Sequence, residues 1–297
     1  MILRANAGEE YHVHEFQHQD TIAMQPEHPL LIRLNAIGHS LRASDHALAL
    51  LGLGSVGRDT HRLDSFSDLD FFAIVEPGYK ERYIAQRDWL EAVHPVSFAF
   101  QNTVDGCKLL FEDGIFCEYA VFEPDELPAI PFSAGRVVWS APGFDIAQLT
   151  PAPRQTGEKS LEWCIGEALT NLYVGLQRYH RGEKLSAMFL IQCYALTRIT
   201  EIAAQIEMPA AASADEFASE RRFEQRFPRL ATSLPGFAQG YTHTLASARA
   251  ILDFLDTHFS ISTALRSQII TLLDAPESSC GHAATNPIQT CLAGQTV

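Results

Sequence analysis

The spacing of apolar residues divides the chain into a first part of short runs and a second part with a helical period. In the first part, Pro29 to Leu41 and Tyr79 to Val93 have helical spacing. Phe71 to Val75 is an unbroken apolar run, which is typical of a strand buried on both faces. Strands are expected at residues 46–53, 69–75, 96–101, 108–111, 115–122 and 136–139.

Beyond residue 156 the pattern is helical. Apolar residues from Lys159 to Tyr179 recur every three or four positions, which predicts a helix with one buried face, and Arg181-Gly182 supplies a stop. Proline-rich sequence between residues 141 and 154 marks a domain boundary. Further helices are expected at 183–206, 214–225, 242–258 and 261–273. We therefore expect an N-terminal arm (1–27), an α/β domain (28–150), a helical domain (156–273) and a flexible tail (274–297).

Composition limits the classes of protein. The chain has 297 residues, 46% of them hydrophobic, and a net charge of −14 with no basic stripe, which argues against a nucleic-acid partner. No apolar stretch is long enough to span a bilayer and the N-terminus does not resemble a signal peptide, so no membrane is expected. Its six cysteines form no C-x-x-C pair, which suits reduced thiols in a cytoplasmic protein.

Candidate chemistry concentrates between residues 52 and 70. An apolar run ends at Gly54-Ser55, where small residues let backbone N–H groups approach a phosphate, and a helix beginning near Ser55 would favour negative charge. Asp68 and Asp70 open the next strand. Side chains two residues apart share a face of a strand, so both carboxylates can reach a hard cation such as Mg²⁺.

The same residues allow a second interpretation. Gly52-x-Gly54-x-x-Gly57 after an apolar run matches a dinucleotide-binding pattern. That fold requires a long amphipathic helix after the glycines, whereas residues 58–67 are polar apart from Leu63 and Phe66. The sequence context therefore argues against a dinucleotide loop.

Gly54-Ser55 followed, after twelve residues, by Asp68-Leu69-Asp70 resembles the signature of the DNA polymerase β-like nucleotidyltransferase superfamily. The chain is most similar to its antibiotic-modifying members, the lincosamide and aminoglycoside nucleotidyltransferases. The sequence around Glu118 resembles the strand that bears the third carboxylate of that family, and residues 161–201 resemble the start of its helical domain. The resemblance implies an α+β fold: a nucleotidyltransferase domain, with a mixed sheet flanked by helices, followed by an α-helical bundle.

The resemblance also implies site residues. Asp68, Asp70 and Glu118 would be catalytic and bind Mg²⁺ or Mn²⁺, with Glu118 as a metal ligand, a general base for the acceptor hydroxyl, or both. Strand alternation puts Glu118 among apolar neighbours, where a carboxylate needs a cation, a metal or a proton. The nucleotide-binding residues would be Gly54, Ser55, Arg58 and Ser67. Further cations for a triphosphate are sought at Lys159, Arg178 and Arg181.

These inferences predict an enzyme that transfers a nucleoside monophosphate from an NTP, with ATP preferred, to a hydroxyl of a small-molecule acceptor such as a lincosamide or aminoglycoside. The acceptor would bind between the two domains. A homodimer is consistent with the pairing of relatives. Two alternatives stay open: an enzyme of the same fold that modifies a protein or RNA, and a non-catalytic nucleotide-binding scaffold.

Overall fold

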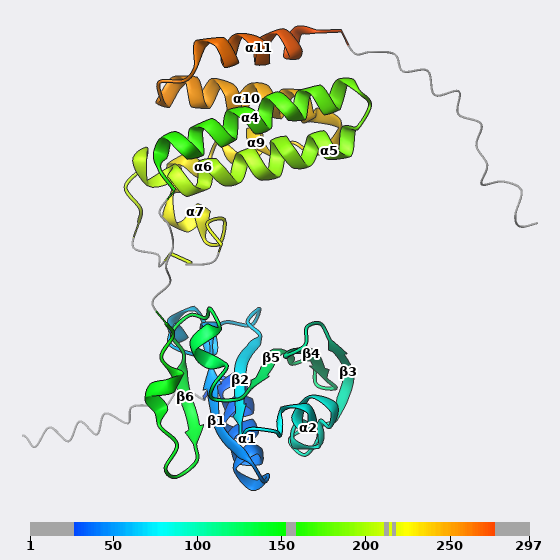
Figure 1. Cartoon of the computed structure of the whole chain (residues 1–297), viewed down its shortest axis with the longest axis vertical. Helices are drawn as coiled ribbons and strands as arrows, with labels where there is room; N and C mark the ends of the chain where they lie inside the picture. Colours follow the sequence, from blue (N-terminus) through cyan, green and yellow to red (C-terminus); the bar gives the residue numbers. More distant parts are fainter. Residues whose placement is uncertain (1–26, 153–158, 211–213, 216–217, 277–297) are drawn as a thin grey trace, which may run out of the picture. The chain divides into compact units, whose positions relative to one another are not determined.

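The computed structural model describes residues 27–152, 159–210, 214–215 and 218–276 (Figure 1). The chain divides into two compact units, Met1–Arg154 and Gln155–Val297. The expected arm, apart from Glu27, and the expected tail beyond residue 276 lie outside the described residues. Among the helices of the described part, none is both long and apolar enough to cross a membrane.

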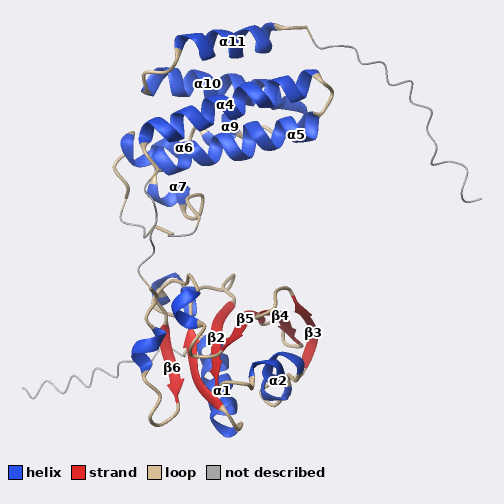
Figure 2. Ribbon diagram, in the orientation of Figure 1, coloured by secondary structure: helices blue, strands red, loops and turns tan. Residues whose placement is uncertain are grey.

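A mixed sheet of six strands forms the centre of the first unit (Figure 2). Its order is β3-β4-β5-β2-β1-β6; β2 and β5 run parallel, and every other neighbouring pair is antiparallel. The expected mixed sheet with flanking helices is thus confirmed. The strands are β1 (Ala47–Gly52), β2 (Leu69–Val75), β3 (Val96–Gln101), β4 (Gly106–Phe111), β5 (Phe116–Phe122) and β6 (Arg136–Ser140).

Helices α1 (Pro29–Ala43), α2 (Lys80–Ala85) and α3 (Asp88–Glu91) contribute to the core on one face of the sheet. This first core includes Leu34, Phe71, Tyr83, Trp89 and Tyr119. The single helix expected over residues 79–93 is wrong, because Gln86 adopts extended backbone and separates α2 from α3. Nε1 of Trp89 donates a buried hydrogen bond of 3.2 Å to the Tyr83 carbonyl, close to this break.

A smaller core covers part of the opposite face. It gathers apolar side chains from β1, β2 and the end of β5, together with the segment that follows β5. This segment contains the short 3-10 turns η3 (Leu127–Ala129) and η4 (Ile146–Leu149). Strands β3 and β4 contribute no buried residue to this second core. Its buried members are Ala49, Leu51, Ile74, Phe122, Leu127, Phe132 and Leu149.

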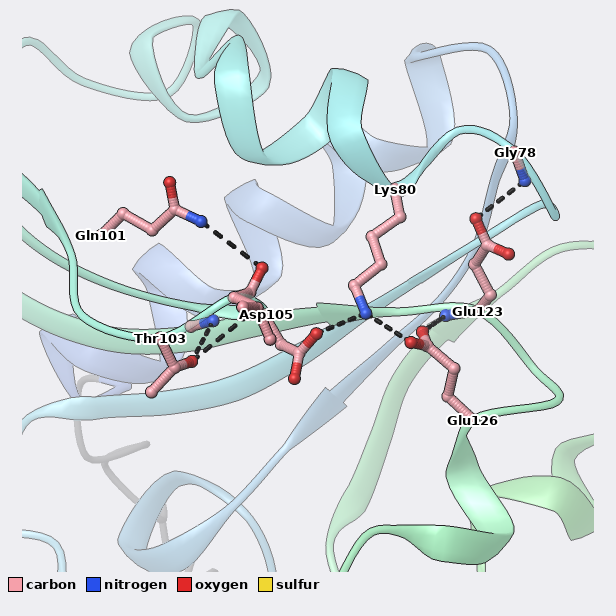
Figure 3. A network of polar contacts seen from close by, with 9 residues as sticks. Gly78, Lys80, Gln101, Thr103, Asp105, Glu123 and Glu126 are labelled. Carbon is pink, nitrogen blue, oxygen red and sulfur yellow. Dashed lines mark hydrogen bonds and ion pairs between the residues drawn. The ribbon is translucent and has the colours of Figure 1, made fainter.

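Lys80 ties three segments of the first unit together (Figure 3). Its Nζ forms an ion pair with Asp105, in the β3–β4 turn, and lies 2.5 Å from Glu126 Oε1. Glu126 also accepts a hydrogen bond from the Glu123 N–H, and Glu123 accepts one from the Gly78 N–H, both at 2.7 Å. Burial disfavours the charged amine, but the hydrogen bonds that it donates to Asp105 and Glu126 outweigh this effect and raise the pKa of Lys80.

The described elements of the second unit are all helical (Figure 2). The expected helix over 183–206 is one helical run interrupted by a π-helical segment, Phe189–Ala195. The expected helix over 214–225 is wrong in its described part, where only α7 forms. The α-helices are α4 (Leu161–His180), α5 (Lys184–Met188), α6 (Leu196–Ile202), α7 (Phe223–Arg226), α8 (Pro228–Ala231), α9 (Leu234–Phe237), α10 (Thr244–His258) and α11 (Thr263–Asp274).

The π-helical segment packs closely on α4 and carries a buried amide. A Cβ on Gly175 of α4 would lie 2.7 Å from Cγ1 of Ile191, so this approach requires glycine. The Gln192 side chain accepts a hydrogen bond from the Gly240 N–H at 2.8 Å and donates one to the Gly240 carbonyl at 2.9 Å. These two hydrogen bonds tie the loop before α10 to the π-helical segment.

Candidate active site

Strands β2 and β5 lie next to each other (Figure 1), and their parallel pairing makes two predicted acidic residues neighbours. Asp70 is the register partner of Glu118, and neighbouring strands lie about 4.8 Å apart. Both side chains alternate with first-core residues, so they share the opposite face of the sheet. Asp68 lies one residue before β2 and is half-buried, as are the other two. The fold therefore groups Asp70 with Glu118 at one end of two central strands.

The glycine turn lies directly against Asp70. Gly54 has a φ of +53°, and a Cβ at this residue would lie 3.2 Å from Asp70 Oδ2. The Leu53 N–H donates a 2.8 Å hydrogen bond to the Asp70 carbonyl, which fixes the turn to the start of β2. The structure thus brings two sequence-predicted residues, Gly54 and Asp70, into one site.

Local packing accounts for the dinucleotide-like glycine pattern. A Cβ on Gly57 would lie 2.6 Å from the Gly52 carbonyl oxygen, and one on Gly52 would lie 2.9 Å from Cδ2 of Leu34. These two glycines therefore allow the turn to fold back over the end of β1, without any need for a bound dinucleotide.

The helix expected to begin near Ser55 is wrong. Only a three-residue 3-10 turn, η1 (Gly54–Val56), forms there, followed by a second, η2 (Thr60–Arg62). Gly57 has a φ of −88° and a ψ of −111°, outside the helical region, and this ends the first turn. Ser55 lies half-buried in η1, and its contact with a phosphate stays a prediction.

Arginines join this turn to the start of β6. Arg58 is exposed, and its Nε donates a 3.0 Å hydrogen bond to the Gly135 carbonyl. Arg136 donates from Nη2 to the Val56 carbonyl at 3.1 Å, a contact that the sequence did not predict. One bond runs from the turn to Gly135 and the other from β6 to the turn, so the turn is fixed to the start of β6 at two points.

Ser67 has a structural role in this conformation. Its Oγ accepts a 3.0 Å hydrogen bond from the Asp64 N–H and donates to Asp64 Oδ1 at 3.2 Å. The Phe66 N–H also donates to Asp64 Oδ1, at 2.9 Å, and the Phe66 side chain is 94% exposed. These bonds shape the loop before Asp68; a direct contact of Ser67 with nucleotide stays a prediction.

Lys108 is the site residue that sequence reasoning missed. Its Nζ lies 2.6 Å from Glu118 Oε1, and the two residues are register partners in the antiparallel β4–β5 pair. The expectation that Glu118 needs a cation, a metal or a proton is met here by the amine. Pairing the predicted strands across the Asp113-Gly114 turn would have put Lys108 opposite Glu118, and this signal was available in the sequence.

A metal site of three ligands is not assembled in the described conformation. Among the described residues, no group of three or more His, Cys, Asp or Glu side chains is placed to hold a metal ion. The donors nevertheless suit Mg²⁺, which takes one or two carboxylates and completes its shell with water and phosphate oxygens. A Cβ on Gly54 would lie 3.2 Å from Asp70 Oδ2, so a side chain at residue 54 would crowd that carboxylate. Asp68, Asp70 and Glu118 as ligands stay a prediction.

Nucleophilic groups on the other face of these strands are chemically quiet. Burial raises the pKa of the Cys117 thiol far above its usual range, and the charges of Asp68 and Asp70 add to the rise. Burial likewise raises the pKa of the Tyr119 hydroxyl. Both side chains belong to the first core, on the face of the sheet opposite to Asp70 and Glu118.

Two of the three basic residues suggested for the triphosphate in the second unit, Lys159 and Arg178, have acidic partners there. Lys159 Nζ lies 2.8 Å from Glu201 Oε1 and 5.1 Å from the centre of the Trp163 ring. Arg178 Nη1 lies 2.6 Å from Glu183 Oε2, and Arg181 is exposed next to the end of α4. Their contact with a nucleotide is not tested by these positions.

No family model matches the chain, and no curated protein matches it in sequence. Two solved structures of antibiotic nucleotidyltransferases are similar to it. The aminoglycoside 6-adenyltransferase from Bacillus subtilis is 12% identical with a TM-score of 0.30, covering 85% of this chain and 94% of its own. The spectinomycin adenyltransferase AAD(9) from Enterococcus faecialis, solved with ATP and spectinomycin, is 10% identical with a TM-score of 0.30, covering 82% and 97%.

The similar structures are thus of the kind that the signature around Asp68 resembles. A TM-score of 0.30 is too low to transfer a fold or an activity from them. The function proposed below therefore rests on the residues of this chain.

Proposed function

We propose that the chain is a metal-dependent nucleotidyltransferase that moves a nucleoside monophosphate from an NTP, with ATP preferred, to a hydroxyl of a small-molecule acceptor. The observation that carries the proposal is the register pairing of Asp70 with Glu118, with Gly54 packed against the Asp70 carboxylate. This arrangement offers paired acids and a glycine turn within one site, as transfer from a triphosphate requires.

Each residue has a role in this reaction. Asp68 and Asp70 would hold Mg²⁺ or Mn²⁺, which when bound offsets the charge of the triphosphate and polarises its α-phosphate. Gly54 and Ser55 would contact phosphate oxygens through the backbone and the serine hydroxyl. Arg58, whose Nε is already bonded to Gly135, would direct its terminal nitrogens at the same charge.

Glu118 would serve the acceptor. Its carboxylate takes the proton of the attacking hydroxyl, the acceptor oxygen forms a bond to the α-phosphorus, and the α–β phosphoanhydride bond breaks to release pyrophosphate. Lys108 keeps a positive charge beside Glu118 before the acceptor arrives.

The favoured acceptors are antibiotics, of the lincosamide or aminoglycoside type, and the corresponding activity would confer resistance. The excess of acidic residues, 36 against 22 basic, supports a small acceptor over a nucleic acid, because nucleic-acid sites need phosphate-neutralising cations. A homodimer is proposed on the resemblance alone.

The test is transfer of nucleotide by the full-length chain. Each NTP with Mg²⁺ is incubated with a panel of lincosamides and aminoglycosides, and pyrophosphate and acceptor mass are measured. We expect one acceptor to gain a nucleoside monophosphate, and Asp70→Asn to reduce kcat by about 10²-fold or more.

Glu81→Gln is the matched control, because Glu81 is an exposed acid on α2, a helix that packs on the first-core face of the sheet, opposite to the face of Asp70. It should retain the wild-type rate. If no acceptor gains mass, no pyrophosphate appears and ATP with Mg²⁺ leaves the melting temperature unchanged, the enzyme proposal is wrong. A metal-dependent ATP shift without turnover would instead indicate the scaffold alternative.

A further inference from the structure

Among the described residues of the first unit, the face of the sheet that carries Asp70 and Glu118 continues as an apolar surface that the second core does not cover. Phe98 and Phe100 of β3 are 54% and 55% exposed, although large aromatic side chains usually find a core. Their neighbour Ala99 packs against the first core, so both phenylalanines point to the opposite face. Here we call Phe98, Phe100, Leu110 and Phe116 the open floor.

Strand register fixes where the open floor lies relative to the carboxylates. Phe98 pairs with Leu110, which pairs with Phe116, and these form one row across β3, β4 and β5. The adjacent row runs from Phe100 through Lys108 and Glu118 to Asp70. At about 4.8 Å per strand, Phe100 lies roughly 10 Å from Glu118, within the length of one drug-sized molecule.

The second core stops where the open floor begins. Phe72 and Ala120, the next residues on this face after Asp70 and Glu118, pack against that core. Phe98 and Phe100 are outside it, and Leu110 and Phe116 are half-buried. Asp70 and Glu118 therefore stand at the border between covered and uncovered sheet, so a molecule lying on the floor meets Glu118 at one end.

The charge of Lys108 restricts which ligand groups can bind on the open floor. Lys108 lies in the row between Phe100 and Glu118, and its amine already pairs with the Glu118 carboxylate. A second amine at this position would face Lys108 at close range, whereas a hydroxyl can accept a hydrogen bond from it. An apolar ring or alkyl group can meanwhile cover the two phenylalanines.

From these contacts we infer that the open floor is the acceptor subsite and selects hydroxylated small molecules with an apolar ring or alkyl face, rather than polyamine sugars. The inference rests on the proposed function, because it takes the reacting hydroxyl to lie at Glu118. It adds the specificity residues Phe98 and Phe100 to that site.

The test combines a binding arm and a turnover arm on the full-length chain. The probes are lincomycin, which bears a propyl group and one amine, and kanamycin, a polyamine sugar. Calorimetry without NTP should show lincomycin binding more tightly than kanamycin. Phe98→Ser and Phe100→Ser should each weaken lincomycin binding, and raise its KM in the transfer reaction, by about 5- to 20-fold with little change in kcat.

Ile32→Ser is the matched control, since Ile32 is 53% exposed on α1 and lies outside the floor. The inference is overturned if lincomycin does not bind, if kanamycin binds equally well, or if the floor variants behave like Ile32→Ser. If Phe98→Ser and Phe100→Ser transfer nucleotide with an unchanged KM for lincomycin, the floor is not the acceptor subsite, although the enzyme proposal is unaffected. Lincomycin binding that the floor variants weaken, with no transfer to any acceptor, would leave the floor as a binding surface and contradict its role as the acceptor subsite of an enzyme.

A second copy of the chain is the competing occupant, because β3 is an edge strand without a charged residue. Light scattering of the wild type and of the double variant Phe98→Ser/Phe100→Ser, over a range of protein concentrations, distinguishes self-association from binding of a small molecule. We expect the same mass for both. A dimer that is lost in the double variant would assign the floor to self-association and overturn the inference.

Discussion

Lys108 and Glu118 form an ion pair, with Nζ 2.6 Å from Oε1, next to the Asp70 carboxylate on the following strand. The Lys108 amine on β4, the Glu118 carboxylate on β5 and the Asp70 carboxylate on β2 therefore lie in one row across three neighbouring strands. Each partner of the pair is partly exposed, so the pair contributes little to stability; its effect is on the charge that a metal ion meets at Asp70.

Replacing Lys108 with methionine should therefore strengthen metal binding. The substitution removes a positive charge about two strands from Asp70, and we expect the Mg²⁺ concentration for half-maximal ATP-dependent thermal shift to fall about 3- to 10-fold. Arg42→Gln, which changes an exposed arginine of α1, makes the same change in net charge and should leave this midpoint unchanged. Equal midpoints in both variants would show that Lys108 is not coupled to the metal position.

Replacing Gly54 with alanine should impair the site beyond its effect on folding. The residue has a φ of +53° and the new Cβ would lie 3.2 Å from Asp70 Oδ2. The left-handed backbone costs about 1 kcal/mol for alanine. Gly78→Ala is the control, because Gly78 has a φ of +88° with nothing within 4 Å of its Cβ position.

Both variants should melt at similar temperatures, measured by circular dichroism, and only Gly54→Ala should lose Mg²⁺-dependent ATP binding. Retention of that binding in Gly54→Ala would contradict the placement of a phosphate beside Asp70.

The ion pair between Arg33 and Asp113 predicts a pH-dependent loss of stability. Arg33 Nη2 lies 2.5 Å from Asp113 Oδ2, and the guanidinium carbon lies 4.4 Å from the centre of the Phe111 ring. Burial opposes ionisation of Asp113, but hydrogen bonds from Arg33 and the Ile115 N–H outweigh it and lower the pKa. A lowered pKa means that the stabilisation is present above the ordinary aspartate value and is lost as the pH falls through the folded value.

Asp113→Asn should accordingly lower the melting temperature at pH 7 by roughly 2–5 °C, since it leaves a buried guanidinium without its counter-ion. The difference in melting temperature between this variant and the wild type should persist down to about pH 4 and become smaller below that pH. Asp125→Asn, which changes an exposed acid, is the control. Its melting temperature should equal that of the wild type at pH 7 and below pH 4. A gap that is constant down to pH 2.5 would contradict the assignment.

Lys80 gives the opposite pH dependence. Its side chain is 17% exposed and bridges Asp105 and Glu126 (Figure 3), so Lys80→Met should destabilise the first unit by about 1–2 kcal/mol at pH 7. Because the pKa of Lys80 is raised above 10.5, this stabilisation is complete below that value and disappears as the pH rises through the folded pKa. Urea unfolding at pH 7, 9 and 11 measures the difference.

Lys159→Met removes a more exposed ion pair, with Glu201, and should change the unfolding free energy by less than about 1 kcal/mol. Equal losses for Lys80→Met and Lys159→Met would show that burial of the Lys80 network contributes nothing.

Local sequence predicted the strands well because each depends on a short run of apolar residues. The expected runs at 69–75 and 96–101 coincide with β2 and β3. The errors fall where the backbone departs from a regular repeat: extended Gln86 splits a predicted helix, and Gly57 ends η1 after one turn. At Gly57 the cause is close packing, since a Cβ there would lie 2.6 Å from the Gly52 carbonyl oxygen. The spacing of apolar residues reports neither this contact nor the backbone angles of an exposed residue such as Gln86.

The sequence by itself determined the candidate chemistry, namely Asp68 and Asp70 two residues apart on one face and a glycine turn before them, since both depend on local spacing. Tertiary structure decided which groups meet. Parallel pairing across 48 residues placed Glu118 beside Asp70, antiparallel pairing placed Lys108 beside Glu118, and the limit of the second core left Phe98 and Phe100 uncovered. The reason is that strand register and coverage depend on contacts between distant segments, whereas the spacing of residues along one strand does not.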